Sequence, residues 1–195
     1  MQLNETSFLS EAELASLGFK SIGKSVKISR RAAFYNPSKI EIGDYTRIDD
    51  FCVLSSGEAG ILLGRNVHIA VYSCLIGKGR VVIDDYANIS SRVSIYSSND
   101  DYSGDFMTNP TVDSRYTNVT SAPVHVGRHA IVGSGSIVLP GVVLGEGACI
   151  GALSLVNKSC KPFSINGGIP VRFINERSRG LEEKYIQKVK DDAES

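Results

Sequence analysis

Aliphatic residues recur at every sixth position in the second half of the chain. From Val126 onward the sequence divides into VGRHAI, VGSGSI, VLPGVV, LGEGAC, IGALSL and VNKSCK. Each segment begins with Val, Leu or Ile, its second residue is often Gly, and its fifth is small or medium-sized. Similar segments begin upstream at Ile22, Ile42, Leu63 and Ile83. This period matches neither the roughly 3.6 residues of an amphipathic helix nor the alternation of a half-buried strand.

A six-residue period suits a chain wound into a triangular coil. Three segments, about 18 residues, close one turn, and successive turns stack at about the strand spacing of 4.8 Å. The first residue of each segment points inward, as does the small fifth residue where space is tight. Gly or Asp near each corner takes backbone angles that β-branched residues resist. We therefore predict an all-β solenoid in which each turn depends on its neighbours, and the alternative is a β-sandwich with accidental periodicity.

The repeat is interrupted between Ile95 and Val126. Beyond the segment that begins at Ile95, an insert of residues 99–122 remains. Its acidic, aromatic and thioether side chains are Asp100, Asp101, Tyr102, Asp105, Phe106, Met107 and Tyr116. A disordered insert would be poorer in aromatic residues, and long loops in compact domains are often functional. The insert is predicted to be an ordered arm that covers a site.

Short helices are predicted at both ends of the solenoid. In SEAELASLG, Ser10 is the N-cap, Glu13 completes a capping box and Gly18 ends the helix. This helix would cover the first turn, whose edge groups are otherwise unpaired. The segment GLEEKYIQKVKDD, after Arg179, is predicted to be a surface or cap helix. The organisation is then an N-terminal cap (1–21), a solenoid domain (22–175) and a helical tail (176–195).

Composition excludes several classes of partner. The 21 basic and 21 acidic residues give zero net charge, which disfavours nucleic acid and anionic membranes as partners. The sequence has no apolar run of about 20 residues, and its N-terminus does not resemble a signal peptide, so a cytoplasmic protein is expected. The cysteines at positions 52, 74, 149 and 160 have no CxxC spacing, which indicates reduced thiols rather than a disulfide framework or a zinc site.

The C-terminal half resembles a known enzyme family. The stretches PVHVGRHAIVGSGSIVLPGVVLGEGACIGALSLVNKS and NGGIPVRFI are similar to the acetyl-CoA-dependent hexapeptide acetyltransferases. The similarity runs from Ile42 to Ile174 and is greatest to the galactoside and maltose O-acetyltransferases and to sugar acetyltransferases of bacterial polysaccharide loci. The resemblance implies a left-handed parallel β-helix and a homotrimer with active sites between subunits. It also implies acetyl-CoA as co-substrate, with no metal expected.

The resemblance also carries over positions that contact the coenzyme. Gly133 and Ser134 align where the pantetheine arm approaches, and Gly151 and Ala152 where a coil stays small beside that arm. Asn157 and Lys158 align with the contacts to the nucleotide end, and Arg172 with a basic residue near the phosphates. Lys and Arg suit phosphate binding. Gly133, Gly151 and Ala152 are also expected from the hexapeptide repeat alone, without any contact to a coenzyme.

The expected catalytic base departs from the family pattern. Some relatives have His-Asp-Tyr in the long loop, whereas this chain has Asn99-Asp100-Asp101-Tyr102, so Asp100 stands at the His position. A carboxylate with a pKa of about 4 is a weak base towards an alcohol, although an adjacent carboxylate raises such a pKa. Asp100 suits an amine acceptor, or a supporting role beside a histidine.

His68 is the histidine that we expect to act beside Asp100. We expect that His68 of one chain faces the loop of another and acts as the general base with Asp100, while the alternative is a surface or interface hydrogen bond. His129 is a weaker rival. The catalytic candidates are thus His68, Asp100 and Asp101. The donors to the oxyanion are expected at Gly133 and Ser134. The acceptor is expected to contact Tyr102, Asp105 and Asn88.

The acceptor is expected to be a sugar. Carboxylates accept hydrogen bonds from hydroxyl and ammonium groups. The polysaccharide-locus relatives imply an amino or hydroxyl group of a bacterial surface sugar, such as an O-antigen precursor, either free or nucleotide-linked. One alternative is a γ-carbonic anhydrase, which binds zinc through three histidines. This chain has His68, His125 and His129, but not that family's spacing. The other alternative is a non-catalytic scaffold.

Overall fold

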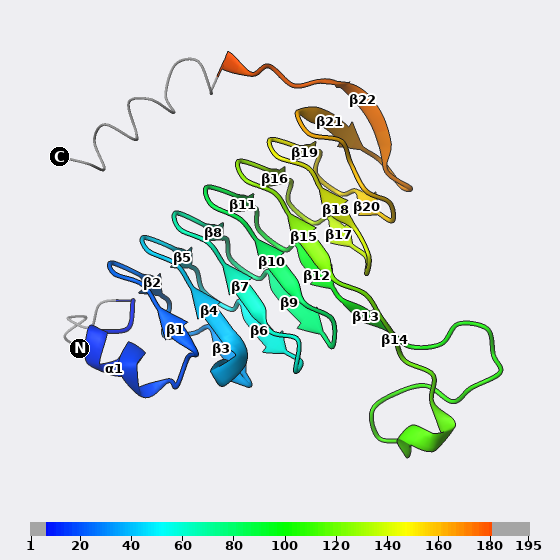
Figure 1. Cartoon of the computed structure of the whole chain (residues 1–195), viewed down its shortest axis with the longest axis horizontal. Helices are drawn as coiled ribbons and strands as arrows, with labels where there is room; N and C mark the ends of the chain where they lie inside the picture. The colour runs from blue at the N-terminus through cyan, green and yellow to red at the C-terminus, as the bar shows by residue number, and fades with distance from the viewer. Residues whose placement is uncertain (1–6, 181–195) are drawn as a thin grey trace, which may run out of the picture.

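Three parallel β-sheets form the walls of a triangular column in the computed structural model, which describes residues 7–180 (Figure 1). Each turn of the chain contributes one short strand to each wall, so the chain is a left-handed parallel β-helix as predicted. The β-sandwich alternative is wrong, because every pairing between turns as far as β21 is parallel and joins equivalent positions of the repeat, as in Ile22↔Ile42 and Asn88↔Ile131.

We call the walls the first, second and third faces in chain order. The first face comprises β1 (Ser21–Ile22), β4 (Ile40–Ile42), β7 (Ile61–Leu63), β10 (Val81–Ile83), β15 (Val124–Val126) and β18 (Val143–Leu144). The second comprises β2 (Lys27–Ile28), β5 (Arg47–Ile48), β8 (His68–Ile69), β11 (Asn88–Ile89), β16 (Ile131–Val132), β19 (Cys149–Ile150), β21 (Ser164–Gly167) and β22 (Arg172–Glu176). The third comprises β3 (Ala33–Tyr35), β6 (Val53–Ser56), β9 (Cys74–Gly77), β12 (Ser94–Tyr96), β17 (Ile137–Val138) and β20 (Leu155–Val156).

Each face is followed by a corner, and the stacked corners make three edges. The first edge follows the first face, the second edge follows the second face, and the third edge follows the third face. We number the coils from the N-terminus, so that coil 4 holds β10, β11 and β12, coil 5 holds β15 to β17, and coil 6 holds β18 to β20.

The core is the column of aliphatic side chains that the repeat predicted. First-position residues such as Val126, Val132 and Val138 are completely buried. The fifth-position residues from Ala130 to Cys160 are at most 8% exposed. Two of them are serines, and their hydroxyls are satisfied: Ser136 donates to the Gly151 carbonyl at 3.0 Å, and Ser154 donates to the same oxygen at 2.7 Å. Small size and internal hydrogen bonds therefore allow polar residues inside the column.

The corners differ from the prediction that Gly or Asp would take the left-handed angles. On the second edge Phe51, Tyr72 and Arg92 do so, with φ of 59°, 63° and 59°. The strain of about 1–2 kcal/mol per residue is offset by stacking between coils. The Phe51 and Tyr72 rings lie 5.0 Å apart at 12°, and the guanidinium of Arg92 lies 5.5 Å from the Tyr72 ring centre. Pairs of this kind contribute about 0.5–1.5 kcal/mol each.

The N-terminal helix is confirmed. Helix α1 (Glu11–Ser16) has Ser10 as N-cap, and Ser10 and Glu13 form a reciprocal capping box. Leu14 is buried against the first coil, and Glu13 pairs with Arg30 at the following corner. The helix therefore covers the open end of the column, as expected from the need to protect its edge groups.

The C-terminal end of the column is closed by a hairpin that was not predicted. β22 turns back and pairs antiparallel with β21, after a cis peptide bond between Ile169 and Pro170. The predicted helix after Arg179 lies outside the described residues, and so does most of the tail placed at 176–195. The four cysteines are free, as expected. No helix within residues 7–180 is long and apolar enough to cross a membrane.

The insert is an arm that leaves the third edge in coil 4 and extends sideways (Figure 1). Its stem is the antiparallel pair β13 (Ser98–Asn99) and β14 (Thr120–Ser121). Its far end carries a 3-10 turn, η2 (Ser114–Tyr116), and the other such turn, η1 (Pro37–Lys39), lies on the solenoid. Hydrogen bonds such as Met107 N to Tyr116 O, 2.8 Å, hold the arm together. The insert is ordered, as predicted, and the expectation that it covers a site stays a prediction.

Candidate active site

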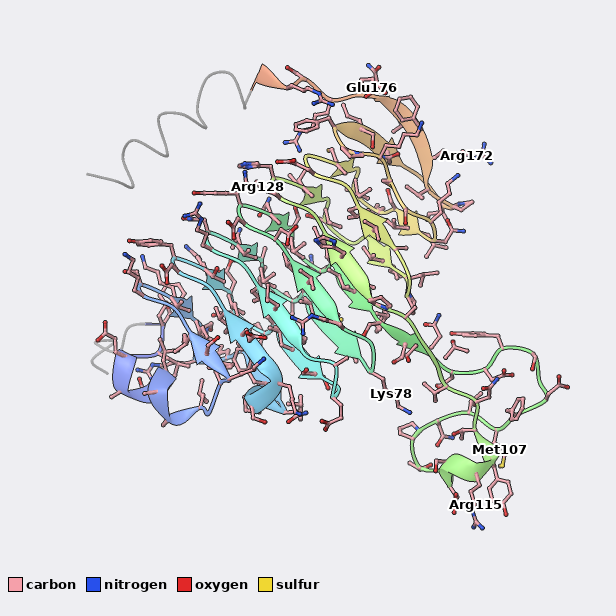
Figure 2. The ribbon with its side chains drawn as sticks, viewed as in Figure 1. Lys78, Met107, Arg115, Arg128, Arg172 and Glu176 are labelled. Atoms are coloured by element: carbon pink, nitrogen blue, oxygen red, sulfur yellow. The ribbon has the colours of Figure 1, made fainter. Side chains whose placement is uncertain are left out.

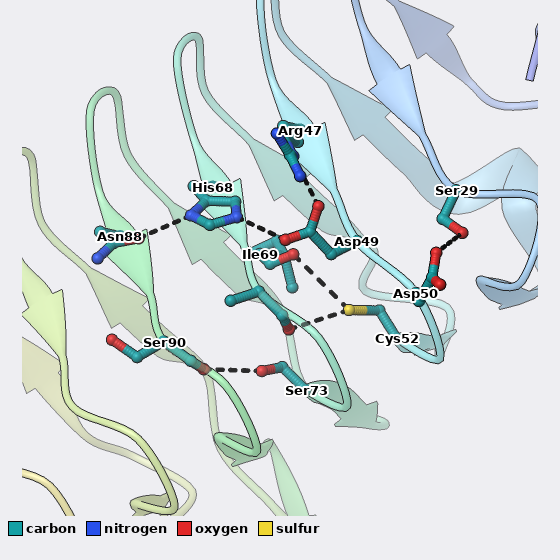
Figure 3. Close-up of polar contacts among 11 residues, drawn as sticks. Ser29, Arg47, Asp49, Asp50, Cys52, His68, Ile69, Ser73, Asn88 and Ser90 are labelled. Atoms are coloured by element: carbon teal, nitrogen blue, oxygen red, sulfur yellow. Dashed lines mark hydrogen bonds and ion pairs between the residues drawn. The ribbon is translucent and has the colours of Figure 1, made fainter. Parts of the chain in front are cut away.

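His68 is the centre of a polar chain on the outside of the second face (Figure 3). Arg47, His68 and Asn88 occupy the same outward position on β5, β8 and β11, because these strands pair in register. His68 Nδ1 lies 3.1 Å from Asn88 Oδ1, and His68 Nε2 lies 2.8 Å from Asp49 Oδ2. Arg47 Nε donates to the other Asp49 oxygen at 2.6 Å.

Both ring nitrogens of His68 are thus occupied by groups of its own chain. A general base needs one nitrogen lone pair directed at the substrate, so His68 must first break one of these contacts. The sequence did not reveal Asp49, although the pair Asp49-Asp50 in IDDFC lies one turn before His68. Burial of the Asp49 carboxyl opposes its ionisation, but hydrogen bonds from His68 and Arg47 outweigh it and hold the pKa of Asp49 below its ordinary value.

The pKa of Asp49 predicts an acid-sensitive contribution to stability. A carboxyl whose pKa is lowered on folding stabilises the fold above its unfolded pKa of about 4, and loses that contribution as the pH falls through the folded pKa. We expect Asp49→Asn to lower the free energy of unfolding by about 1–2 kcal/mol at neutral pH, and by less at pH values below about 4. Urea unfolding at several pH values measures the difference.

Glu58→Gln is the matched control for Asp49→Asn. Glu58 pairs with Lys39, but its side chain is 85% exposed, so we expect a change below about 0.5 kcal/mol. A deficit for Asp49→Asn that is equally large at neutral and acidic pH would contradict the ionic role of the carboxylate.

The other two histidines lie elsewhere. His125 is on the first face, where its Nε2 lies 2.7 Å from Asp84 Oδ2. His129 is on the first edge, and its ring stacks on Tyr86 with 5.0 Å between centres. Among residues 7–180, no three His, Cys, Asp or Glu side chains gather as a metal site would require. The three histidines of one chain therefore do not converge.

The two adjacent carboxylates of the arm have different surroundings. Asp101 Oδ1 accepts from the backbone N and the hydroxyl of Ser103, and Asp101 Oδ2 accepts from Asn118. These hydrogen bonds lower the pKa of Asp101, so Asp101 holds the arm in shape and is a poor proton acceptor. Asp100 is exposed, and within the described residues its carboxylate has no partner. Tyr102, at 90% exposed, and the exposed Asp105 lie on the same arm.

The predicted pantetheine positions lie together on the second edge. Gly133 and Ala152 occupy consecutive coils, and a Cβ added at Gly133 would lie 2.5 Å from Ala152 N. The carbonyl of Ser134 accepts from Leu153 N at 2.9 Å. The glycine at 133 is therefore required by the next coil, whereas a Cβ at Gly151 would meet nothing closer than 3.5 Å.

A pocket of about 470 Å³ opens at the C-terminal end of the column. Its lining includes Lys158, which was predicted, together with Lys161, Phe173 and Glu176, which were not. Two ammonium groups beside an exposed aromatic ring suit a phosphorylated nucleotide. Phe173 was missed because it reaches the pocket only through the unpredicted hairpin. Arg172, adjacent to it, is exposed on β22 (Figure 2), and Asn157 is exposed on the third edge.

Comparisons with known proteins identify relatives of this chain. Residues 123–158 match the family described as bacterial transferase hexapeptide (six repeats). The chain is 58% identical over 176 residues, 90% of this chain and 92% of the relative, to a dTDP-4-amino-4,6-dideoxy-D-glucose acyltransferase of Escherichia coli.

Two solved structures of AntD, an N-acyltransferase from Bacillus cereus, resemble the whole fold. One, with dTDP and 3-hydroxybutyryl-CoA bound, has a TM-score of 0.91 and 42% identity, covering 97% of this chain and 100% of that chain. The other is a serine-to-cysteine variant with dTDP-4-amino-4,6-dideoxyglucose and coenzyme A, with a TM-score of 0.91 and 41% identity over 96% of this chain and 100% of that chain.

Proposed function

Because the chain belongs to the hexapeptide-repeat sugar acyltransferases, we propose that it N-acetylates a dTDP-linked 4-amino-4,6-dideoxyglucose. The transfer of an acyl group from an acyl-CoA to a sugar, predicted from the sequence, is confirmed by these relatives. These relatives argue against the two alternatives, a γ-carbonic anhydrase and a non-catalytic scaffold. The observation that carries the finer proposal is 58% identity over nearly the full length of an enzyme with this sugar in its name.

An amine acceptor explains the carboxylate at the position of the family histidine. An alcohol must lose a proton of very high pKa as it attacks. An ammonium ion has a much lower pKa, and the neutral amine that remains after it loses its proton attacks unaided. An exposed carboxylate such as Asp100 is sufficient to receive that proton. The departure from the family pattern therefore indicates an amine as the acceptor.

The reaction balances without a metal or a redox partner. The ammonium group of the sugar gives a proton to Asp100, and the nitrogen lone pair then forms a bond to the thioester carbonyl carbon. The carbon–sulfur bond breaks, and the sulfur leaves with its electron pair as a thiolate. The thiolate takes the second proton that the nitrogen releases, so that the products are an amide and the coenzyme A thiol, and Asp100 returns its proton to solvent. The developing oxyanion requires a backbone N–H donor. Gly133 N already donates to Ile150 O at 2.8 Å, so the expectation that it helps to hold the oxyanion is corrected, and the N–H of Ser134 remains the proposed source.

His68 takes a positioning role in this scheme. Its Nδ1 fixes the Asn88 amide, and Asp49 fixes the ring. Asn88 then presents a defined amide on the outer face of coil 4, which we propose as a contact for the acceptor sugar. Tyr102 and Asp105 of the arm complete that contact.

We propose that the coenzyme extends along coils 5 and 6 to the C-terminal pocket. Gly133, Ser134, Gly151 and Ala152 border the pantetheine arm on the second edge. The phosphates lie near Lys158 and Lys161, with Asn157 and Arg172 as further contacts. The small residues at 151 and 152 leave the edge open, and the two lysines supply positive charge where the nucleotide end is expected.

The oligomeric state and the cellular location are proposed from the resemblance to the same family. We propose a homotrimer with active sites between subunits, located in the cytoplasm, where acyl-CoA and nucleotide sugars are both available. Its product would be a precursor of a bacterial surface polysaccharide such as an O-antigen.

A substrate pair tests the chemistry directly. Thiol release from acetyl-CoA is measured with dTDP-4-amino-4,6-dideoxyglucose and with dTDP-glucose, which carries a hydroxyl group at the same carbon. We expect turnover with the amine and at least about 100-fold less with the alcohol. Equal rates would contradict N-acylation, and a preference for 3-hydroxybutyryl-CoA over acetyl-CoA would replace the proposed acyl group.

A further inference from the structure

We propose that Arg177 is a positioning residue of the acyl-donor site. It ties the C-terminal hairpin to the solenoid and thereby gives the protein a preference for acyl donors that carry the nucleotide of coenzyme A. The inference rests on the proposed function, because it takes the C-terminal pocket as the place of that nucleotide. It is carried by the contacts of the Arg177 guanidinium, by the exposed pocket residues on β22 and by the shape of the corner at Gly147.

Two residues reach the pocket only through β22. Phe173 is 56% exposed, and Glu176 is exposed three residues later on the same strand (Figure 2). β22 is the last strand of the second face, where it pairs with β21, and the register of that pair shifts between Ile165 and Asn166. A terminal strand with one neighbour and an irregular register is weakly held by its own pairing. The orientation of its side chains therefore depends on further contacts.

The side chain of Arg177 makes such contacts. Arg177 follows directly after β22 and is half-buried. Its Nη1 donates to His129 O at 3.0 Å and to Gly147 O at 2.9 Å. These carbonyls belong to successive corners of the first edge, in coils 5 and 6. One guanidinium group therefore joins the end of β22 to two coils of the solenoid.

The main chain of Arg177 extends the pairing of β22. Its N–H donates to Phe163 O at 2.7 Å, one residue before Ser164, which pairs with Glu176. Phe163 takes the left-handed angle of the next corner on the first edge, with φ of 49°. Arg177 thus contacts three successive corners of one edge, through its N–H and its guanidinium group.

The corner at Gly147 is shaped to admit the hairpin. The corner before it carries a larger residue, His129, at the equivalent left-handed position. A Cβ added at Gly147 would lie 2.7 Å from two ring carbons of Phe163, so the Phe163 ring occupies the space that a side chain would need. The guanidinium of Arg179 lies 4.4 Å from the centre of that ring. Arg177 and Arg179 therefore hold the segment after β22 against this edge at two points.

The guanidinium of Arg177 suits this structural task better than phosphate binding. Its Nη1 is occupied by two carbonyl oxygens, and Arg177 does not line the pocket. A planar guanidinium with several N–H groups in fixed positions bridges two carbonyls more precisely than a lysine ammonium does. Arg177 acts on the nucleotide only through the strand that it holds.

The pocket and the reacting thioester are separate parts of the donor site. An exposed ring such as Phe173 can stack on a base, and the ammonium groups of Lys158 and Lys161 attract phosphate. The thioester is proposed at Ser134, on the second edge. Loss of the Arg177 contacts should therefore weaken binding of the nucleotide and leave the transfer step unchanged for a donor that has no nucleotide.

Two acyl donors test the inference. Thiol release is measured with acetyl-CoA and with acetyl-pantetheine, which lacks the nucleotide, and with dTDP-4-amino-4,6-dideoxyglucose as acceptor. For Arg177→Met we expect kcat/KM for acetyl-CoA to fall about 10-fold, mainly through KM. With acetyl-pantetheine the variant should stay within about 2-fold of the wild type. Arg177→Lys should recover part of the loss, because it keeps the charge and a donor.

Arg128→Met is the matched control. Arg128 is an exposed arginine on the same edge (Figure 2) and does not line the pocket. This substitution removes a positive charge from the first edge without touching the hairpin contacts of Arg177. We expect it to leave the kinetics with both donors unchanged.

The outcomes separate the inference from the proposed function. A wild type that uses acetyl-pantetheine as well as acetyl-CoA would overturn the proposed place of the nucleotide, and the inference would fall with it. If the wild type prefers acetyl-CoA, an equal loss with both donors in Arg177→Met, or no loss with either, would refute the positioning role alone. If Arg177→Met does not fold, Arg177→Lys decides in its place, since its smaller loss should again be confined to acetyl-CoA.

A binding measurement decides the case of an inactive wild type. Such a result would overturn the proposed acceptor, whereas adenosine 3′,5′-bisphosphate, the nucleotide end of coenzyme A, still probes the pocket. By calorimetry we expect the wild type to bind it about 10-fold more tightly than Arg177→Met does. Equal affinities, or no binding by the wild type, would refute the inference.

Discussion

Asp100→Asn is expected to lower kcat/KM for the amino sugar by about 100-fold, the usual range for a positioned acid or base. Asparagine has the same shape as aspartate but cannot receive the ammonium proton. Because Asp100 is exposed, the substitution should not impair folding, so a folding defect would not explain the loss of activity. The loss should fall mainly on kcat, because a proton transfer, rather than binding, is impaired.

The pH profile separates this role from a merely structural one. Bulk solvent can deprotonate the amine at high pH, so the activity of Asp100→Asn should rise towards that of the wild type as the pH increases. Steady-state rates at several pH values, with the dTDP-linked amino sugar saturating, measure this rise. A constant ratio between variant and wild type across the range would exclude proton acceptance by Asp100.

Two matched variants complete this experiment. Asp101→Asn removes a carboxylate that accepts hydrogen bonds from Ser103 and Asn118, so we expect a higher KM for the sugar with a smaller change in kcat. His68→Gln keeps a polar side chain beside Asn88 and should reduce activity by less than about 10-fold. A loss for His68→Gln as large as that for Asp100→Asn would restore His68 as the general base.

Gly133→Ala is expected to destabilise the solenoid by about 3 kcal/mol, the upper part of the range for overpacking. The new methyl group would lie 2.5 Å from Ala152 N, 2.7 Å from Ile150 O and 2.8 Å from Gly151 C. All three atoms belong to the backbone of the next coil, so no side chain can move aside. Coils 5 and 6 would have to separate, which lengthens the hydrogen bonds between them.

Thermal unfolding with Gly151→Ala as control measures this cost. The two glycines occupy the same position of the repeat on successive coils, but a methyl group at 151 meets Asn166 O at 3.5 Å, an ordinary contact. For a chain of this size about 3 kcal/mol corresponds to roughly 6–12 °C in Tm, and we expect Gly151→Ala to change Tm by less than about 3 °C. Equal Tm shifts for the two variants would contradict the role of the close contact between Gly133 and the backbone of coil 6.

The polar chain around His68 illustrates the limit of inference from one sequence. Asp49, His68 and Asn88 are separated by about 20 residues at each step, which is one turn of the solenoid. The repeat therefore predicts that they lie near each other, but it does not say whether the side chains contact one another or a substrate. The distances of 2.8 and 3.1 Å decide that they contact one another.

The C-terminal hairpin gives a second example. The residues NGGIPVRFI resemble the family ending, and Arg172 was placed at the coenzyme on that basis, as Lys158 was from the stretch before it. Antiparallel pairing of β22 with β21 brings Phe173 and Glu176 to the pocket with Lys158, while Arg172 lies outside its lining. A change of strand direction is set by pairing at the open end of the sheet, and no periodic pattern encodes it.

The hexapeptide pattern was enough to predict the three-sided column of this protein. One aliphatic residue in six and a small fifth residue leave few ways to bury the side chains other than a three-sided column, so the core, the end cap and the interrupted coil were all predictable. Which polar groups remain available for chemistry depends on side-chain contacts that arise only in the folded chain. Stacking sets residues one turn apart in contact and thereby engages both His68 nitrogens. Hydrogen bonds within the arm engage the Asp101 carboxylate and leave Asp100 exposed.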